Sequence, residues 1–108
     1  MRKFDETYCL IPEMVRDGYY PDDLVEKVQQ EIQKLVAVLE QGEQCPEVIQ
    51  QELDRMTLAI NDLQEEFEAQ DSEIETVARE SIAATVSYIL HWFHIDIDID
   101  TALGARDW

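Results

Sequence analysis

The chain has 108 residues, of which 25 are Asp or Glu and 8 are Lys or Arg, so its formal net charge at pH 7 is −17. Affinity for nucleic-acid phosphates and for anionic lipid surfaces comes from Lys and Arg, so this charge argues against direct nucleic-acid or membrane binding. A hydrophobic fraction of 45 % is ordinary for a folded protein, and we expect a single domain over residues 1–108.

The chain start and the cysteines bear on where the protein resides. The opening MRKFDET is basic at first, but carboxylates interrupt the apolar run that a signal peptide needs. The longest stretch without Asp, Glu, Lys or Arg, residues 81–95, is shorter than a membrane-spanning helix requires. Cys9 and Cys45 are too few for a disulfide framework or a zinc site, and we expect two reduced thiols buried as small core residues. The expected location is the cytoplasm.

The first helices are marked by turn residues and by apolar periodicity. A short helix is predicted around residues 13–16, and Asp17-Gly18 after it is a turn signal. A long helix is predicted at about residues 21–40, because Pro21 suits a first helical turn and apolar residues follow at steps of three and four. These apolar residues are Leu24, Val25, Val28, Ile32, Leu35, Val36 and Leu39.

A second long helix is predicted at about residues 46–68, after a stop at Gly42 and a new start at Pro46. Its apolar residues recur at alternating steps of four and three, which is typical of a helix packed against an antiparallel neighbour. They are Ile49, Leu53, Met56, Ile60, Leu63 and Phe67.

A third long helix is predicted at about residues 72–93. Ser72 followed by Glu75 has the spacing of a capping box, in which the hydroxyl and the carboxylate each accept a free backbone N–H. The buried face of this helix is expected to hold Ile74, Val77, Ala78, Ile82, Thr85, Val86, Ile89, Leu90 and Phe93.

Two segments carry a family resemblance. DGYYPDDLVEKV and INDLQEEFEAQDSEIETVARESIA combine an aromatic-aromatic-Pro start, an acidic NDL-x-EEFE stretch and an S-E-x-ETVARE-x-IA helix. Over about residues 13–90 the chain resembles a family of small, acidic bacterial proteins of unknown function. The resemblance implies an all-helical domain and implies no activity. The tail IDIDIDTALGARDW lies outside it.

The tail, residues 95–108, alternates Ile and Asp from Ile95 to Asp100, which is the period of a strand. A lone strand would have no partner in a helical domain, so we expect an extended arm with isoleucines packed on the helices and aspartates in water. Leu103 and Trp108 are the expected anchors of the arm. The fold class predicted is therefore all-α: a small bundle of three long helices plus a short N-terminal helix, with an extended C-terminal arm.

Candidate chemistry is sparse. The aspartates of the tail have EF-hand spacing, but Thr101 stands where the loop needs glycine, and we expect no tight calcium binding. His91 and His94 at i, i+3 could share a helix face, yet further metal ligands are missing. Neither a glycine-rich phosphate loop nor a cysteine with an activating base is present. We predict no catalytic residue, no metal and no cofactor, and expect that the protein is not an enzyme.

The most distinctive feature is a run of seven carboxylates without an intervening Lys or Arg, namely Asp62, Glu65, Glu66, Glu68, Asp71, Glu73 and Glu75. Such a run is either a solvated helix face or a docking surface for a basic protein. We expect a non-catalytic domain that binds a basic partner, as an immunity or antitoxin-like inhibitor of a bacterial toxin such as a nuclease. The alternatives are a nucleic-acid mimic that regulates a DNA- or RNA-binding protein, and a small-molecule or metal-binding helical domain.

Overall fold

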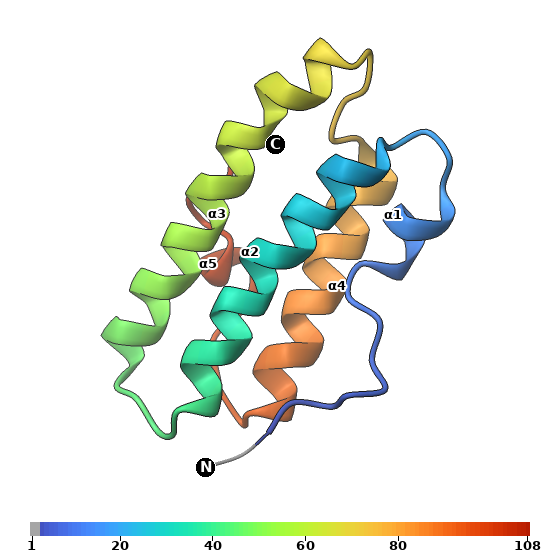
Figure 1. The fold of residues 1–108 in the computed structure, drawn as a ribbon. Coiled ribbons are helices and arrows are strands. Elements are labelled where there is room, and N and C mark those ends of the chain that lie inside the picture. The colour runs from blue at the N-terminus through green and yellow to red at the C-terminus, as the bar shows by residue number, and fades with distance from the viewer. Residues whose placement is uncertain (1–2) are drawn as a thin grey trace.

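The computed structural model describes residues 3–108, and every regular element in that range is a helix. The elements are α1 (Pro12–Arg16), α2 (Asp22–Glu40), α3 (Pro46–Ala69), α4 (Thr76–Trp92) and α5 (Ile99–Ala102). Helices α2, α3 and α4 run alternately down, up and down the long axis of the molecule, with α1 and α5 packed on either side of α4 (Figure 1). The predicted all-helical class is confirmed.

The core is formed by the stripes that the sequence predicts for α2 and α3. All seven apolar residues predicted for the buried face of α2 are buried, and so are all six predicted for α3. A short link from Gln41 to Cys45 folds α3 back against α2, as the antiparallel spacing requires. On α4 the prediction holds except at two positions, since Val77 is 40 % exposed and Phe93 is half-buried.

The connection between α3 and α4 differs from the predicted capping box. Helix α3 ends in a Schellman motif: Asp71 has φ 58°, its N–H donates to the Glu68 carbonyl at 3.1 Å, and the Ser72 N–H donates to the Phe67 carbonyl at 2.9 Å. This ties Ser72 to the end of α3, so it cannot begin the next helix. Residues 72–75 are not helical and α4 begins at Thr76, four residues later than predicted.

Tyr20, rather than Ser72, accepts a backbone hydrogen bond at the start of α4. The Tyr20 phenol oxygen accepts the N–H of Ala78, in the first turn of α4, at 3.2 Å. Ser72 is buried, and its hydroxyl donates to the Tyr19 carbonyl at 3.3 Å. This hydrogen bond connects the segment between α3 and α4 to the turn before α2. The predicted cap by Ser72 and Glu75 is therefore wrong, and the two aromatic residues before Pro21 hold this junction.

The N-terminal segment lies along α4 through a group of aromatic rings. The Phe4 ring has its centroid 5.9 Å from the ring centroids of both Tyr88 and Trp92. The Tyr88 hydroxyl donates to the Asp5 carboxylate at 2.7 Å, and this hydrogen bond raises the pKa of Tyr88. Further along, the Ile11 N–H donates to the buried Thr85 hydroxyl at 2.9 Å. These contacts place α1 against α4.

The C-terminal tail is only partly the extended arm that was predicted. From Ile95 to Asp100 isoleucines are half-buried against the core and aspartates are exposed, as expected. The tail then turns into α5, because the Asp98 carboxylate accepts the Thr101 N–H at 3.2 Å and caps a new helix start. The predicted anchors hold, with Leu103 fully buried and Trp108 packed against the core.

Candidate functional site

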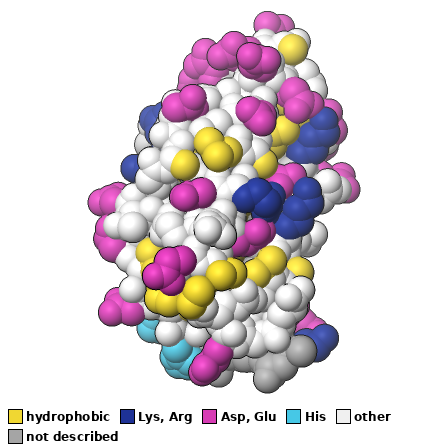
Figure 2. Space-filling model, turned by 90° about the vertical axis from the view of Figure 1, so that its left-hand side faces the viewer, with side chains coloured by type: hydrophobic (Ala, Val, Ile, Leu, Met, Phe, Trp, Pro, Cys, Tyr) yellow, Lys and Arg dark blue, Asp and Glu magenta, His cyan; other side chains and the backbone are white. Residues whose placement is uncertain are grey.

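The seven predicted carboxylates lie together at one end of the bundle. Four of them occupy the last turns of α3 and three the link to α4. All seven are exposed. Figure 2 shows acidic side chains gathered at the top of the molecule, at the level where α3 ends in Figure 1. We call this surface the acidic end; its residues are Asp62, Glu65, Glu66, Glu68, Asp71, Glu73 and Glu75.

Two carboxylates at the start of α2, which the sequence analysis did not include, lie beside the acidic end. Asp22 and Asp23 are exposed in the first turn of α2. The Gln70 side-chain amide donates to the Asp23 carboxylate at 3.2 Å, which places Asp23 beside the end of α3. This proximity follows from the predicted antiparallel packing, because a hairpin of α2 and α3 brings the start of α2 close to the end of α3.

Only one member of the acidic end has a cationic partner within residues 3–108. The Lys27 ammonium lies 2.5 Å from the Glu66 carboxylate, and this hydrogen bond raises the pKa of Lys27. The pair joins α2 to α3, so Glu66 contributes to the contact between these two helices. Arg79 lies nearby in sequence, but its guanidinium donates to the Ile74 carbonyl at 3.3 Å and to the Thr76 hydroxyl at 3.1 Å.

The charge of the acidic end follows from its position on the helices. Apart from Thr57, the residues of α3 that face the core are apolar, and the acidic-end carboxylates between them are exposed. Glu73 and Glu75 were expected to lie in a first helical turn, but Glu73 precedes α4 and Glu75 is its N-cap residue, without a side-chain capping bond. An exposed group of like charges with little internal compensation attracts cations over long range.

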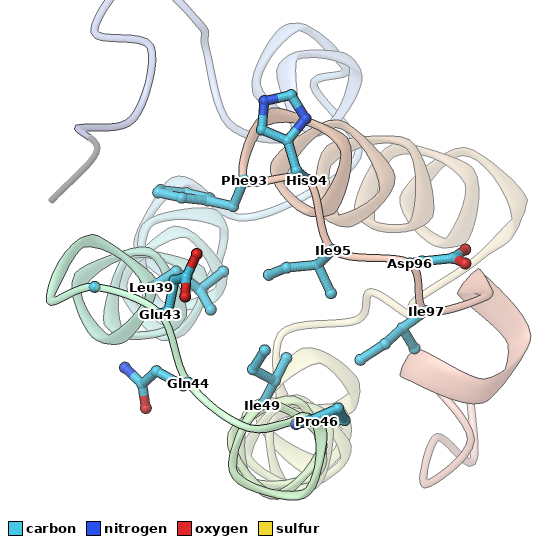
Figure 3. A pocket seen from close by; sticks show the side chains of 11 residues that line it. Leu39, Glu43, Gln44, Pro46, Ile49, Phe93, His94, Ile95, Asp96 and Ile97 are labelled. Atoms are coloured by element: carbon cyan, nitrogen blue, oxygen red, sulfur yellow. The ribbon is translucent and has the colours of Figure 1, made fainter.

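A pocket of about 650 Å³ lies at the opposite end of the bundle. Figure 3 shows it between the link from α2 to α3 and the segment after α4. Six apolar side chains form most of its wall, and Glu43, Gln44, His94 and Asp96 also line it. The six are Leu39, Pro46, Ile49, Phe93, Ile95 and Ile97.

The predicted thiol and histidine positions need correction. Cys9 and Cys45 are both exposed rather than buried, because Cys9 lies on the N-terminal segment and Cys45 precedes α3. His94 has φ 57° and lies beyond the end of α4, where its N–H donates to the His91 carbonyl at 3.1 Å. It therefore does not share a helix face with His91. No group of three or more His, Cys, Asp or Glu able to hold a metal ion occurs among residues 3–108.

None of the helices between residues 3 and 108 is both long enough and apolar enough to cross a membrane. The chain belongs to a family of unknown function (DUF5713), whose model matches residues 4–108. The match includes the tail from Ile95 onward, which the sequence resemblance had left out. Comparisons with curated proteins and with solved structures gave no match.

Proposed function

We propose that the domain binds a basic protein through its acidic end and performs no catalysis. The observation that carries the proposal is the lack of internal compensation: six of the seven carboxylates make no ion pair with a cation of residues 3–108, and Glu66 alone is paired. Carboxylates crowded at one end repel one another, and a cationic partner would turn this repulsion into attraction.

The physical role of such a surface is to speed up association. A concentrated patch of one sign steers an oppositely charged partner toward it and raises the association rate by about 10- to 1,000-fold, an effect that salt suppresses. We propose that the partner is a bacterial toxin such as a nuclease, held inactive by this domain. The alternative partner is a DNA- or RNA-binding protein whose nucleic-acid site the acidic end occupies. A toxin reading frame next to the gene favours the first, and displacement of nucleic acid from a regulator favours the second.

The test uses a variant that removes four negative charges from the acidic end and is designed to leave the fold intact. Glu66 is left unchanged because of Lys27, and Asp71 and Glu75 because of their backbone positions. The four changes are Asp62→Asn, Glu65→Gln, Glu68→Gln and Glu73→Gln. A control variant removes four exposed carboxylates that make no ion pair in the described structure. Its changes are Glu6→Gln, Glu43→Gln, Glu47→Gln and Asp96→Asn.

The partner is captured from native cytoplasm at low salt, and its association rate is then measured with each variant. We expect the acidic-end variant to associate about tenfold more slowly, and the control variant, with the same net charge, to remain near the wild-type rate. Wild-type association should slow as salt is added. A partner that binds the acidic-end variant at the wild-type rate, or whose contact surface is not basic, would refute the proposal.

A further inference from the structure

The pocket opposite the acidic end is built from three helix ends. The C-terminal end of α2 contributes Leu39, the N-terminal turn of α3 contributes Pro46 and Ile49, and the residues after α4 contribute Phe93 and Ile95. At about 650 Å³, the pocket lies within the range of about 300–1,000 Å³ found for small-molecule sites. It therefore offers room for a compound larger than a solvent molecule.

The wall of the pocket is apolar and partly accessible. Phe93, Ile95 and Ile97 are half-buried and packed against the core, so each keeps some surface free. Figure 3 shows Ile49, Ile95 and Ile97 directed toward one another across the hollow, whereas the His94 ring and the Asp96 carboxylate point away from it. The interior thus favours an aliphatic or aromatic group.

The electrostatics of the pocket favour a cation. Two helix C-termini, those of α2 and α4, end here, and each carries partial negative charge. The last turn of α2 has no basic residue, although the Gln44 side-chain amide donates to its Val38 carbonyl, whereas the last turn of α4 has His91. The opposing N-terminus of α3 is weakened as an anion site, because Pro46 has no N–H and Glu47 occupies the first turn. Glu43 places a carboxylate at the edge of the hollow beside Leu39 (Figure 3).

We propose that this pocket binds a small hydrophobic amine. Its apolar body lies against the isoleucines and Phe93, and its ammonium group lies at the rim, next to Glu43 and the ends of α2 and α4. An anionic amphiphile of the same size would be repelled by the same groups. This site is independent of the acidic end, which lies at the other end of a molecule about 40 Å long.

The test compares three probes with one apolar body and different head groups: 4-phenylbutylamine, 4-phenylbutanol and 4-phenylbutyrate. Each is titrated into the whole protein at neutral pH while backbone amide resonances are followed by NMR. We expect shifts in residues 39–49 and 93–97, with the amine bound about fivefold more tightly than the alcohol and the carboxylate bound most weakly.

Two point variants distinguish the effect of the rim carboxylate on binding from the effect of the protein's net charge. Glu43→Gln should reduce the advantage of the amine over the alcohol by about two- to threefold, because it removes one carboxylate from the rim. Glu80→Gln, an exposed carboxylate of α4 outside the pocket, should leave that ratio unchanged. Equal binding of amine and carboxylate, shifts concentrated at the acidic end, or no shift with any probe would each overturn the proposal. These outcomes leave the proposed protein partner of the acidic end untouched.

Discussion

Replacing Tyr20 with phenylalanine tests how α4 begins. Tyr20 is 4 % exposed, and its phenol oxygen accepts the N–H of fully buried Ala78 at 3.2 Å. Phenylalanine keeps the ring, including its edge-to-face contact with Phe67, and removes only the acceptor. A buried N–H without a partner costs about 1–3 kcal/mol. We expect Tyr20→Phe to lower the free energy of unfolding by roughly 2 kcal/mol and the melting temperature by roughly 10 °C.

The neighbouring tyrosine gives a matched control. Tyr19 is 44 % exposed, and within residues 3–108 its hydroxyl makes no hydrogen bond, so Tyr19→Phe should change stability by less than about 0.5 kcal/mol. Urea unfolding followed by helical circular dichroism measures both variants. If Tyr20→Phe unfolds at the same midpoint as Tyr19→Phe, the phenol does not support the start of α4 and the reasoning is wrong.

The pH dependence of the same variant gives a second readout. Burial raises the pKa of Tyr20 above its ordinary value of 10.0. As the pH rises through about 10, the unfolded chain releases this proton while the folded chain keeps it, so the stability contributed by the buried phenol is lost at high pH. Phenylalanine cannot titrate, and the raised pKa of Tyr88 affects the stability of both proteins in the same way. The stability difference between wild type and Tyr20→Phe should therefore shrink above pH about 10.

Two further changes test the chain reversals on either side of α4. Asp71→Gly should raise the free energy of unfolding by about 0.5 kcal/mol, because Asp71 has φ 58° and glycine adopts this conformation without strain; Asp71→Asn, which keeps the Cβ atom, should gain less, as urea midpoints would show. Asp98→Ala should cost about 1 kcal/mol through loss of the bond from the Thr101 N–H. Faster hydrogen exchange of residues 99–104, with α2 and α3 unchanged, would show that the loss is local, and unchanged exchange there would refute the cap.

The parts of the fold that were predictable are those set by periodicity. An apolar stripe such as that of α2 predicts both the helix and its buried face, because the apolar side chains must be buried whichever neighbouring helix covers them. The single-turn α1 was also predicted to within one residue of its observed start, and the Asp17-Gly18 turn marks its end. These elements depend on near neighbours in sequence and need no knowledge of the rest of the chain.

The start of α4 and the end of the tail depend on residues far away in sequence. Ser72 followed by Glu75 is a valid capping pattern, but the Tyr19 carbonyl and the Tyr20 phenol come from residues more than fifty positions earlier. In the tail, the Gln50 side-chain amide donates to the Thr101 carbonyl at 3.1 Å, so α3 helps to hold α5. Local patterns contain none of these long-range hydrogen bonds, which is why the sequence predicted a longer third helix. The Asp98 cap of α5 is local, and the prediction of a fully extended arm missed this signal.

The acidic end was predictable as a list of residues but not as a surface. Its exposure follows from the apolar face of α3, while its proximity to Asp23 and the pairing of Glu66 with Lys27 depend on how α2 packs. The pocket had no sequence signal at all. Its lining combines residues 39–49 and 93–97, which only the folded bundle brings together.

The distribution of the few cations explains why the acidic end remains uncompensated. Arg55 lies 2.7 Å from the Glu31 carboxylate of α2 and also 2.7 Å from Glu52 of α3, and Lys27 reaches across the same interface to Glu66. Lys27 and Arg55 thus lie where α2 and α3 meet. The exposed Lys27–Glu66 pair contributes at most about 1 kcal/mol, whereas the two Arg55 pairs are half-buried. At the acidic end neighbours at i, i+3 repel and only Glu66 is paired with a cation of residues 3–108, so the missing charge is what the proposed basic partner would supply.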